Sequence, residues 1–138
     1  MTRARREVMA SEVWSTLTDL VINHERKREV CEETGLSFGK TRALRRITER
    51  PLSMGELATV LGMDPPNVTT MIDDLQSAGL VERHAHPSDR RVMLVVITTA
   101  GAKLAQLAED VLSRPPEGLH NLAEDDLDEL RRILTKLR

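Results

Sequence analysis

The sequence predicts a mainly α-helical protein that carries one small two-stranded β-hairpin. Three observations predict this fold class. Apolar residues recur every three or four positions over most of the chain, prolines and several glycines fall between these segments, and only one pair of short segments is rich in β-branched residues. With 138 residues, the chain is long enough for one hydrophobic core and too short for two ordinary domains.

The first two helices are predicted from apolar spacing and from the residues that begin and end them. Between Glu7 and about Cys31 there is no glycine or proline, and apolar residues recur at helical spacing. We therefore predict one long helix there, ended by Gly35. Ser37 suits the N-cap of a second helix that continues to about Ile47.

The next two helices are joined by a very short turn. Ser53-Met-Gly-Glu56 has the form of a capping box, and Gly62 ends the helix that it begins. Asp64-Pro65 starts another helix at once, and Gly79 suits its C-terminal end. The residues expected to face inward on this second helix are Val68, Met71, Ile72 and Leu75. Two helices around a glycine-containing turn are the signature of a helix-turn-helix, whose second helix enters the major groove of DNA.

A β-hairpin follows this helix pair. Segments 80–85 and 92–97 are strand-like, with the polar tip His86-Pro-Ser-Asp-Arg-Arg91 between them. Another helix starts at Thr98 or Thr99, residues 114–118 interrupt it, and the last helix has an acidic run at 124–126 near its N-terminus. We therefore predict one folded unit with an N-terminal helix in 1–36, a helix-turn-helix with its hairpin in 37–101, and C-terminal helices in 102–138.

Composition excludes several classes of protein. No apolar run is long enough to cross a membrane, and the first residues are arginine-rich where a signal peptide would be apolar, so we expect a cytoplasmic protein without a membrane partner. The only aromatic residues are Trp14 and Phe38, which is too few for stacking on single-stranded nucleic acid. The formal net charge is −2, yet residues 37–101 hold eight basic and seven acidic residues and are the least acidic part.

Four segments, in this order and at this spacing, resemble one known family. They are Asn67-Val-Thr-Thr-Met-Ile-Asp-Asp-Leu75, Gly79-Leu-Val-Glu-Arg83, His86-Pro-Ser-Asp-Arg-Arg91 and Ile97-Thr-Thr-Ala-Gly101. Together they are similar to the multiple-antibiotic-resistance regulator (MarR) family. The resemblance covers essentially the whole chain and implies a winged helix-turn-helix fold with N- and C-terminal dimerisation helices. It also implies a sequence-specific regulator that binds double-stranded DNA as a homodimer and works as a ligand-responsive repressor. The sequence has no nucleophile–base pairing or metal motif that would support an enzyme, and we expect no cofactor.

The DNA-reading helix is expected to expose the face opposite its apolar stripe. An asparagine side chain can bridge two atoms of adenine, and threonine offers a hydroxyl and a methyl group to base edges. The residues predicted to contact DNA from this helix are Pro66, Asn67, Thr69, Thr70 and Asp73. Family members commonly have arginine where this chain has Thr70 and Asp74, and we expect Asp74 to repel a phosphate. Residues expected to meet the DNA backbone are Lys40, Thr41, Arg42, Arg83 and His84.

The hairpin tip is the second predicted contact with DNA, through Asp89, Arg90 and Arg91. A guanidinium at such a tip can enter the narrow minor groove, where the negative potential is concentrated. The resemblance implies that Arg90 is the inserted side chain and that Asp89 orients it. The alternative is an ordinary turn with a surface ion pair of little energetic weight.

Other residue patterns have weaker functional interpretations. Trp14 and His24 could line a pocket for a small-molecule effector, of an aromatic or phenolic kind, although a tryptophan at helical spacing is more often part of a core. His84 and His86 could chelate a metal but lack further ligands, so we expect exposed histidines and no metal site. Cys31 is expected to be a small buried hydrophobic residue, since neighbouring glutamates disfavour a reactive thiolate.

Two alternative functions stay open at this point. The scarcity of basic residues on the reading helix is compatible with a dimeric adaptor module that keeps the fold and does not bind DNA. Gly35-Leu-Ser-Phe-Gly-Lys-Thr41 resembles a phosphate-binding loop, but it has three residues between the glycines where that motif needs four, so a nucleotide-hydrolysing enzyme is the weakest alternative.

Overall fold

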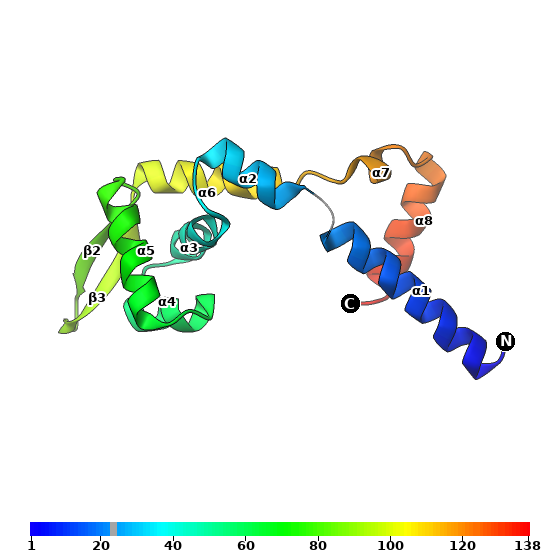
Figure 1. The fold of residues 1–138 in the computed structure, drawn as a ribbon, viewed down its shortest axis with the longest axis horizontal. Helices are drawn as coiled ribbons and strands as arrows, with labels where there is room; N and C mark the ends of the chain where they lie inside the picture. Colours follow the sequence, from blue (N-terminus) through cyan, green and yellow to red (C-terminus); the bar gives the residue numbers. More distant parts are fainter. Residues whose placement is uncertain (23–24) are drawn as a thin grey trace. The chain divides into compact units, whose positions relative to one another are not determined.

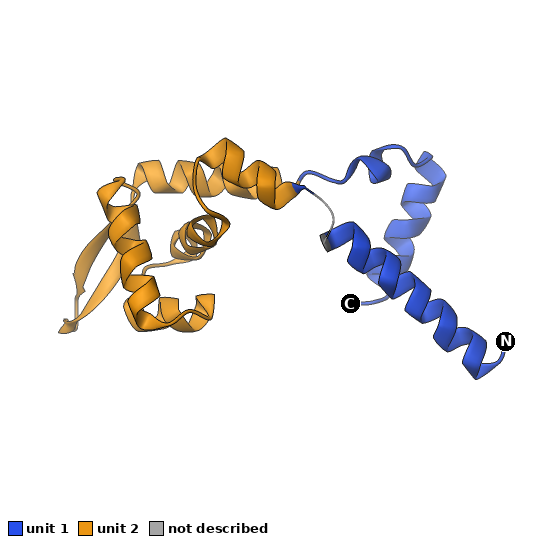
Figure 2. Cartoon of the chain, in the orientation of Figure 1, with its two compact units in different colours: residues 1–25, 114–138 blue, residues 26–113 orange. Residues whose placement is uncertain are grey.

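The computed structural model describes residues 1–22 and 25–138 and divides them into two compact units (Figures 1 and 2). Unit 2 comprises residues 26–113, and unit 1 comprises residues 1–25 and 114–138. The elements of unit 2 are α2 (Arg26–Thr34), α3 (Phe38–Glu49), β1 (Leu52–Ser53), α4 (Met54–Leu61), α5 (Pro65–Ser77), β2 (Val81–His86), β3 (Asp89–Ile97) and α6 (Thr99–Leu112). Those of unit 1 are α1 (Arg3–Ile22), α7 (Glu117–His120) and α8 (Glu124–Thr135).

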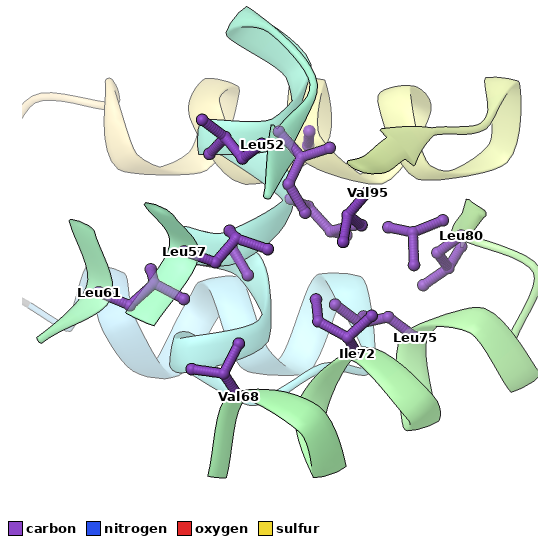
Figure 3. Close-up of a cluster of buried hydrophobic side chains, with 13 residues drawn as sticks. Leu52, Leu57, Leu61, Val68, Ile72, Leu75, Leu80 and Val95 are labelled. Carbon is purple, nitrogen blue, oxygen red and sulfur yellow. The ribbon is translucent and has the colours of Figure 1, made fainter. Parts of the chain in front are cut away.

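The core of unit 2 lies between helices α3, α4 and α5 and a three-stranded antiparallel sheet of order β1-β3-β2 (Figure 3). Leu44, Leu57 and Ile72 from the three helices and Val95 from β3 are completely inaccessible to solvent. A second, smaller cluster joins Val30 of α2 to α6, which also packs along α3. Burial of these side chains is the main source of free energy that holds unit 2 together.

The helix-turn-helix, α4 and α5, forms as its sequence predicts. Ser53 Oγ accepts a hydrogen bond from the Glu56 amide at 3.1 Å, and the Glu56 carboxylate accepts one from the Ser53 amide at 3.3 Å. Gly62, with φ of 63°, ends α4 in the left-handed conformation that glycine adopts without strain. Helix α5 then starts with two prolines in its first turn, where their missing N–H groups cost nothing.

The hairpin of β2 and β3 is tighter than predicted and belongs to a larger sheet. Only Pro87 and Ser88 form the turn, so residues 89–91 lie in β3 and not in a six-residue tip. Strand β1 was not predicted; its Leu52 is buried and pairs with Val95. A strand of two residues has no alternation that a sequence pattern could reveal.

Gly101 fixes how closely α6 approaches the start of β2. A Cβ atom at this position would lie 2.0 Å from the backbone oxygen of Leu80, a distance that atoms cannot occupy. The Thr98 hydroxyl caps α6 by accepting a hydrogen bond from the Gly101 amide at 3.1 Å. The Thr-Thr-Ala-Gly segment therefore both begins this helix and allows its close packing.

The N-terminal region differs from the single long helix that the sequence predicted. The structure has two helices, α1 and α2, and they belong to different units. The physical reason is that Val30 of α2 is buried against Ala108 and Val111 of α6. The compact unit 2 consequently begins at residue 26 and ends at residue 113, whereas the sequence analysis divided the chain after 36 and 101.

Unit 1 has little buried surface of its own. Neither α7, a short helix that the sequence analysis did not identify, nor α8 contains a buried residue. Large apolar side chains stand exposed on α1 and on the C-terminal segment, including Val8, Val13, Trp14, Val21, Leu127, Ile133 and Leu137. Among the described helices, none combines the length and apolar character that a membrane crossing requires.

Candidate nucleic-acid interface

Helix α5 presents one polar face to solvent and one apolar face to the core, as the sequence predicted. Val68, Ile72 and Leu75 are buried, and Met71 is half-buried beside them. The exposed residues on the other side are Pro66, Asn67, Thr69, Thr70, Asp73 and Asp74. The β2–β3 hairpin packs beside this helix (Figure 1). The helix and the hairpin thus share one surface of unit 2.

The first half of this exposed face offers hydrogen-bonding groups of a defined kind. The hydroxyl of Thr69 donates to the Pro65 carbonyl oxygen, and that of Thr70 donates to the Pro66 carbonyl oxygen, both at 3.1 Å. Both threonines are exposed, and their oxygen atoms keep lone pairs that can accept hydrogen bonds. The Asn67 side chain has no hydrogen bond to any other described residue. Its amide is therefore available to donate and accept toward a ligand.

The second half of the face is acidic, and cations from neighbouring elements neutralise it. The Arg83 guanidinium of β2 donates to Asp73 at 2.6 Å and to Gln76 at 2.6 Å. Lys40 Nζ in the first turn of α3 lies 3.4 Å from the Asp74 carboxylate. Sequence reasoning missed both ion pairs, because it treated the two cations only as backbone contacts for DNA.

The three backbone candidates on α3 differ in accessibility. Thr41 is 1% exposed, and its hydroxyl donates to the Phe38 carbonyl oxygen at 2.7 Å. The prediction that Thr41 meets the DNA backbone is therefore wrong, because a buried hydroxyl cannot reach a phosphate. Lys40 and Arg42 are half-buried and keep part of their side chains at the surface. Ser37 caps this helix, as predicted, by accepting a hydrogen bond from the Lys40 amide at 3.3 Å.

At the hairpin tip, Asp89 pairs with Arg91 and not with Arg90. The Asp89 carboxylate accepts hydrogen bonds from Arg91 Nε and from the Arg91 amide, both at 3.1 Å. These bonds, the side-chain bond foremost, lower the pKa of Asp89, so its carboxylate stays ionised. The prediction that Asp89 orients Arg90 is therefore wrong. Arg90 itself is exposed and has no ion pair with any residue that the structure describes.

The remaining polar groups of the hairpin face solvent or their own strand. His84 Nε2 lies 2.8 Å from the Glu82 carboxylate, and both side chains are exposed. His86 Nδ1 accepts a hydrogen bond from the Ser88 amide at 3.0 Å. The register shifts between Ala85 and His86, which interrupts the alternation on which a shared face for the two histidines depended. Within residues 1–22 and 25–138, no group of three potential metal ligands comes together.

The remaining candidates are the two effector-pocket residues, the lone cysteine and the segment that resembles a phosphate-binding loop. Trp14 is 70% exposed on α1 and is not part of a core in this chain, and His24 lies outside the described residues. Cys31 is half-buried on α2, less enclosed than expected.

The Gly35–Thr41 segment joins two helices and the described sheet is antiparallel, whereas a phosphate-binding loop connects a parallel strand to a helix. The structure therefore contradicts the nucleotide-binding interpretation.

Part of this chain is similar to one family of known proteins. Residues 34–92 match the family model described as MarR family. The transcriptional regulator BldR of Sulfolobus solfataricus is 26% identical, with a TM-score of 0.63 over 99% of each chain. The reduced form of MarR from E. coli is 25% identical, with a TM-score of 0.66 over 99% of this chain and 96% of that chain. A mutant of S. aureus MepR bound to an oligodeoxyribonucleotide shares the fold at 22% identity, with a TM-score of 0.70 over 90% of this chain and 94% of that chain.

Proposed function

We propose that the chain is a winged-helix transcription regulator of the MarR family, whose model matches residues 34–92, and that it binds a specific double-stranded DNA site as a homodimer. The observation that carries this proposal is the surface shared by α5 and the hairpin. The helix offers two threonines and an asparagine amide, and the hairpin offers an exposed arginine; neither the amide nor the arginine is paired with a residue that the structure describes. This combination suits a helix that contacts base edges in a major groove and a cation that enters the neighbouring minor groove.

Each side chain has a distinct role in this proposal. Asn67 makes a bidentate contact with adenine, and the methyl groups of Thr69 and Thr70 contact thymine. Pro66 packs against the groove edge at the start of the helix. Arg90 enters the minor groove, while Arg91, held by Asp89, stays at the phosphate backbone. The residues proposed to make further backbone contacts are Arg42 and His84, whereas Lys40 and Arg83 are engaged in ion pairs with Asp74 and Asp73.

The exposed apolar surface of unit 1 supports the homodimer. Burying side chains such as Val13 of α1 and Leu134 of α8 against a second copy would remove them from water at a gain of roughly 25 cal/mol per Å². A two-fold dimer places its two reading helices about 34–36 Å apart, one turn of B-DNA, and therefore prefers a pseudo-palindromic operator.

We further propose a repressor that a small molecule releases. A ligand that binds better to a state with altered spacing between the two reading helices lowers affinity for the operator by shifting the population toward that state. Trp14 and His24 are the proposed lining residues, and a tryptophan and a histidine suit an aromatic or phenolic compound. This role requires no catalytic group and no cofactor, and the protein would act in the cytoplasm.

The proposal is tested by selecting bound fragments from genomic DNA and measuring affinity for the selected site by fluorescence anisotropy. Asn67→Ala should change which sequence is preferred, with a loss of about 1–3 kcal/mol at one base pair. Arg90→Ala should weaken binding to every sequence and flatten the salt dependence by about one unit. Lys103→Ala, which removes an exposed cation from α6, is the matched control and should change neither property.

If the wild-type protein retains no duplex DNA, the proposal is rejected in favour of a dimeric adaptor module. Unchanged affinity of Arg90→Ala at moderate salt would reject the role of the hairpin.

A further inference from the structure

Two carboxylates on the DNA-reading helix lie where a DNA-binding surface would be expected to carry positive charge. Asp73 is bound by Arg83 of β2 at 2.6 Å, and Asp74 lies 3.4 Å from Lys40 of α3. Both cations come from elements on either side of α5. The four charges cancel, so the second half of the reading surface contributes no net positive charge.

Within each pair the acid is more exposed than the base. The side chains of Asp73 and Asp74 are 60% and 56% exposed, whereas those of Arg83 and Lys40 are 22% and 29% exposed. A phosphate that approaches α5 therefore meets a carboxylate before it meets the cation. The Arg83 guanidinium also donates a hydrogen bond to Gln76 at 2.6 Å, so two of its nitrogen atoms already have partners.

We propose that Asp73 and Asp74 are specificity-determining residues that hold Arg83 and Lys40 in intramolecular ion pairs and thereby suppress binding to DNA of unrelated sequence. The inference rests on the proposed function and deepens it. Affinity for unrelated DNA comes almost entirely from cations that displace counterions at phosphates. A cation engaged by a carboxylate displaces none, whereas base contacts from Asn67, Thr69 and Thr70 are unaffected and still favour the correct site.

The test uses the full-length protein with Asp73→Asn, Asp74→Asn and the double substitution. Asparagine keeps the shape of the side chain at these exposed positions and removes its charge. Affinity is measured by fluorescence anisotropy for the selected operator and for a scrambled duplex of equal length, over a series of salt concentrations. Circular dichroism of each variant verifies that the fold is retained.

We expect each substitution to tighten binding to the scrambled duplex about three- to tenfold and to steepen the logarithmic salt dependence by about one unit. The operator should gain less, so that the ratio of the two affinities falls. Asp110→Asn, which removes an exposed carboxylate of α6 whose described partner is Gln106, is the matched control and should leave both affinities unchanged.

Testing the substitution in a Lys40→Ala background distinguishes release of a cation from loss of repulsion between the carboxylate and the DNA phosphates. If Asp74 acts by holding Lys40, then Asp74→Asn should lose more than half of its effect on the scrambled duplex when Lys40→Ala is also present. An undiminished effect in that background would overturn the proposal for this pair. Unchanged or weaker binding of the scrambled duplex by both single variants would overturn it altogether, as would loss of operator binding in Asp73→Asn, which would indicate a carboxylate that reads cytosine.

These outcomes are distinct from failure of the proposed function. A wild-type protein that retains no DNA in the selection rejects the function itself. A wild-type protein that prefers its operator, with Asp73 and Asp74 variants that discriminate equally well, rejects only the role of the ion pairs.

Discussion

Units 1 and 2 differ in where they keep their apolar side chains. Every fully enclosed apolar residue in the described chain lies between residues 30 and 111, within unit 2. Unit 1 instead displays large apolar residues on α1 and α8 and buries none of those on α7 or α8. Unit 2 is therefore stabilised by its own core, whereas unit 1 leaves its large apolar side chains exposed to solvent.

This division matches the proposed roles of the two units. A reading surface must hold its side chains in fixed positions, and the core beneath α5 provides that rigidity. A dimerisation region must leave apolar surface available for a second copy, as unit 1 does. The spacing of the two reading helices would then depend on an interface outside the reading domain, which allows a ligand at that interface to change it.

The largest effect is expected from a cavity in the core of unit 2. Leu44→Ala removes a completely buried side chain and should lower the free energy of unfolding by about 2–5 kcal/mol, measured by chemical denaturation. Val60→Ala, at an exposed position of α4, is the control and should cost less than about 1 kcal/mol. Similar losses for the two variants would show that the core described here is not the stabilising one.

A smaller effect, confined to association, is expected from a charge on unit 1. Leu134→Asp should raise the dimer dissociation constant at least about tenfold, or about 1.4 kcal/mol, because the carboxylate must be desolvated at the interface. Analytical ultracentrifugation measures this constant, and the circular dichroism spectrum of the protein should show that unit 2 stays folded. Arg132→Ala, on the opposite face of α8 by helical periodicity, should change it by less than about 0.5 kcal/mol. Unaltered association of Leu134→Asp would contradict the assignment of this face.

Some of this organisation could be predicted from the sequence and some could not. The caps at Ser37 and Ser53, the tight turn at Gly62 and the inward face of α5 are local, so propensity and spacing were sufficient. Strand β1, the buried position of Thr41 and the partner of Asp89 depend on contacts with other elements or on the exact hairpin register. The ion pairs of Lys40 and Arg83 bridge separate elements, and no sequence spacing encodes them.

The smallest effect is a pH dependence at the cap of α4. The hydrogen bond from Arg50 is the main cause that lowers the pKa of Glu56 below its ordinary value of 4.5, with the Ser53 amide second. Since the pKa is lowered on folding, the stabilisation is fully present above pH 4.5 and is lost as the pH falls through the folded-state pKa. Glu56→Gln should therefore be less stable than wild type near neutral pH and equal to it in acid, as measured by denaturation at each pH. A difference that persists in acid would assign the effect to packing.

The central claim, two reading helices on successive turns of one DNA site, is tested most directly by footprinting the selected operator. Dimethyl sulfate reports the major groove, and hydroxyl radicals report the minor groove. We predict two protected major-groove tracts centred about 10 base pairs apart, with protected minor-groove positions beside them that Arg90→Ala no longer protects. A single protected tract, or tracts whose spacing is not a multiple of the helical repeat, would contradict the account.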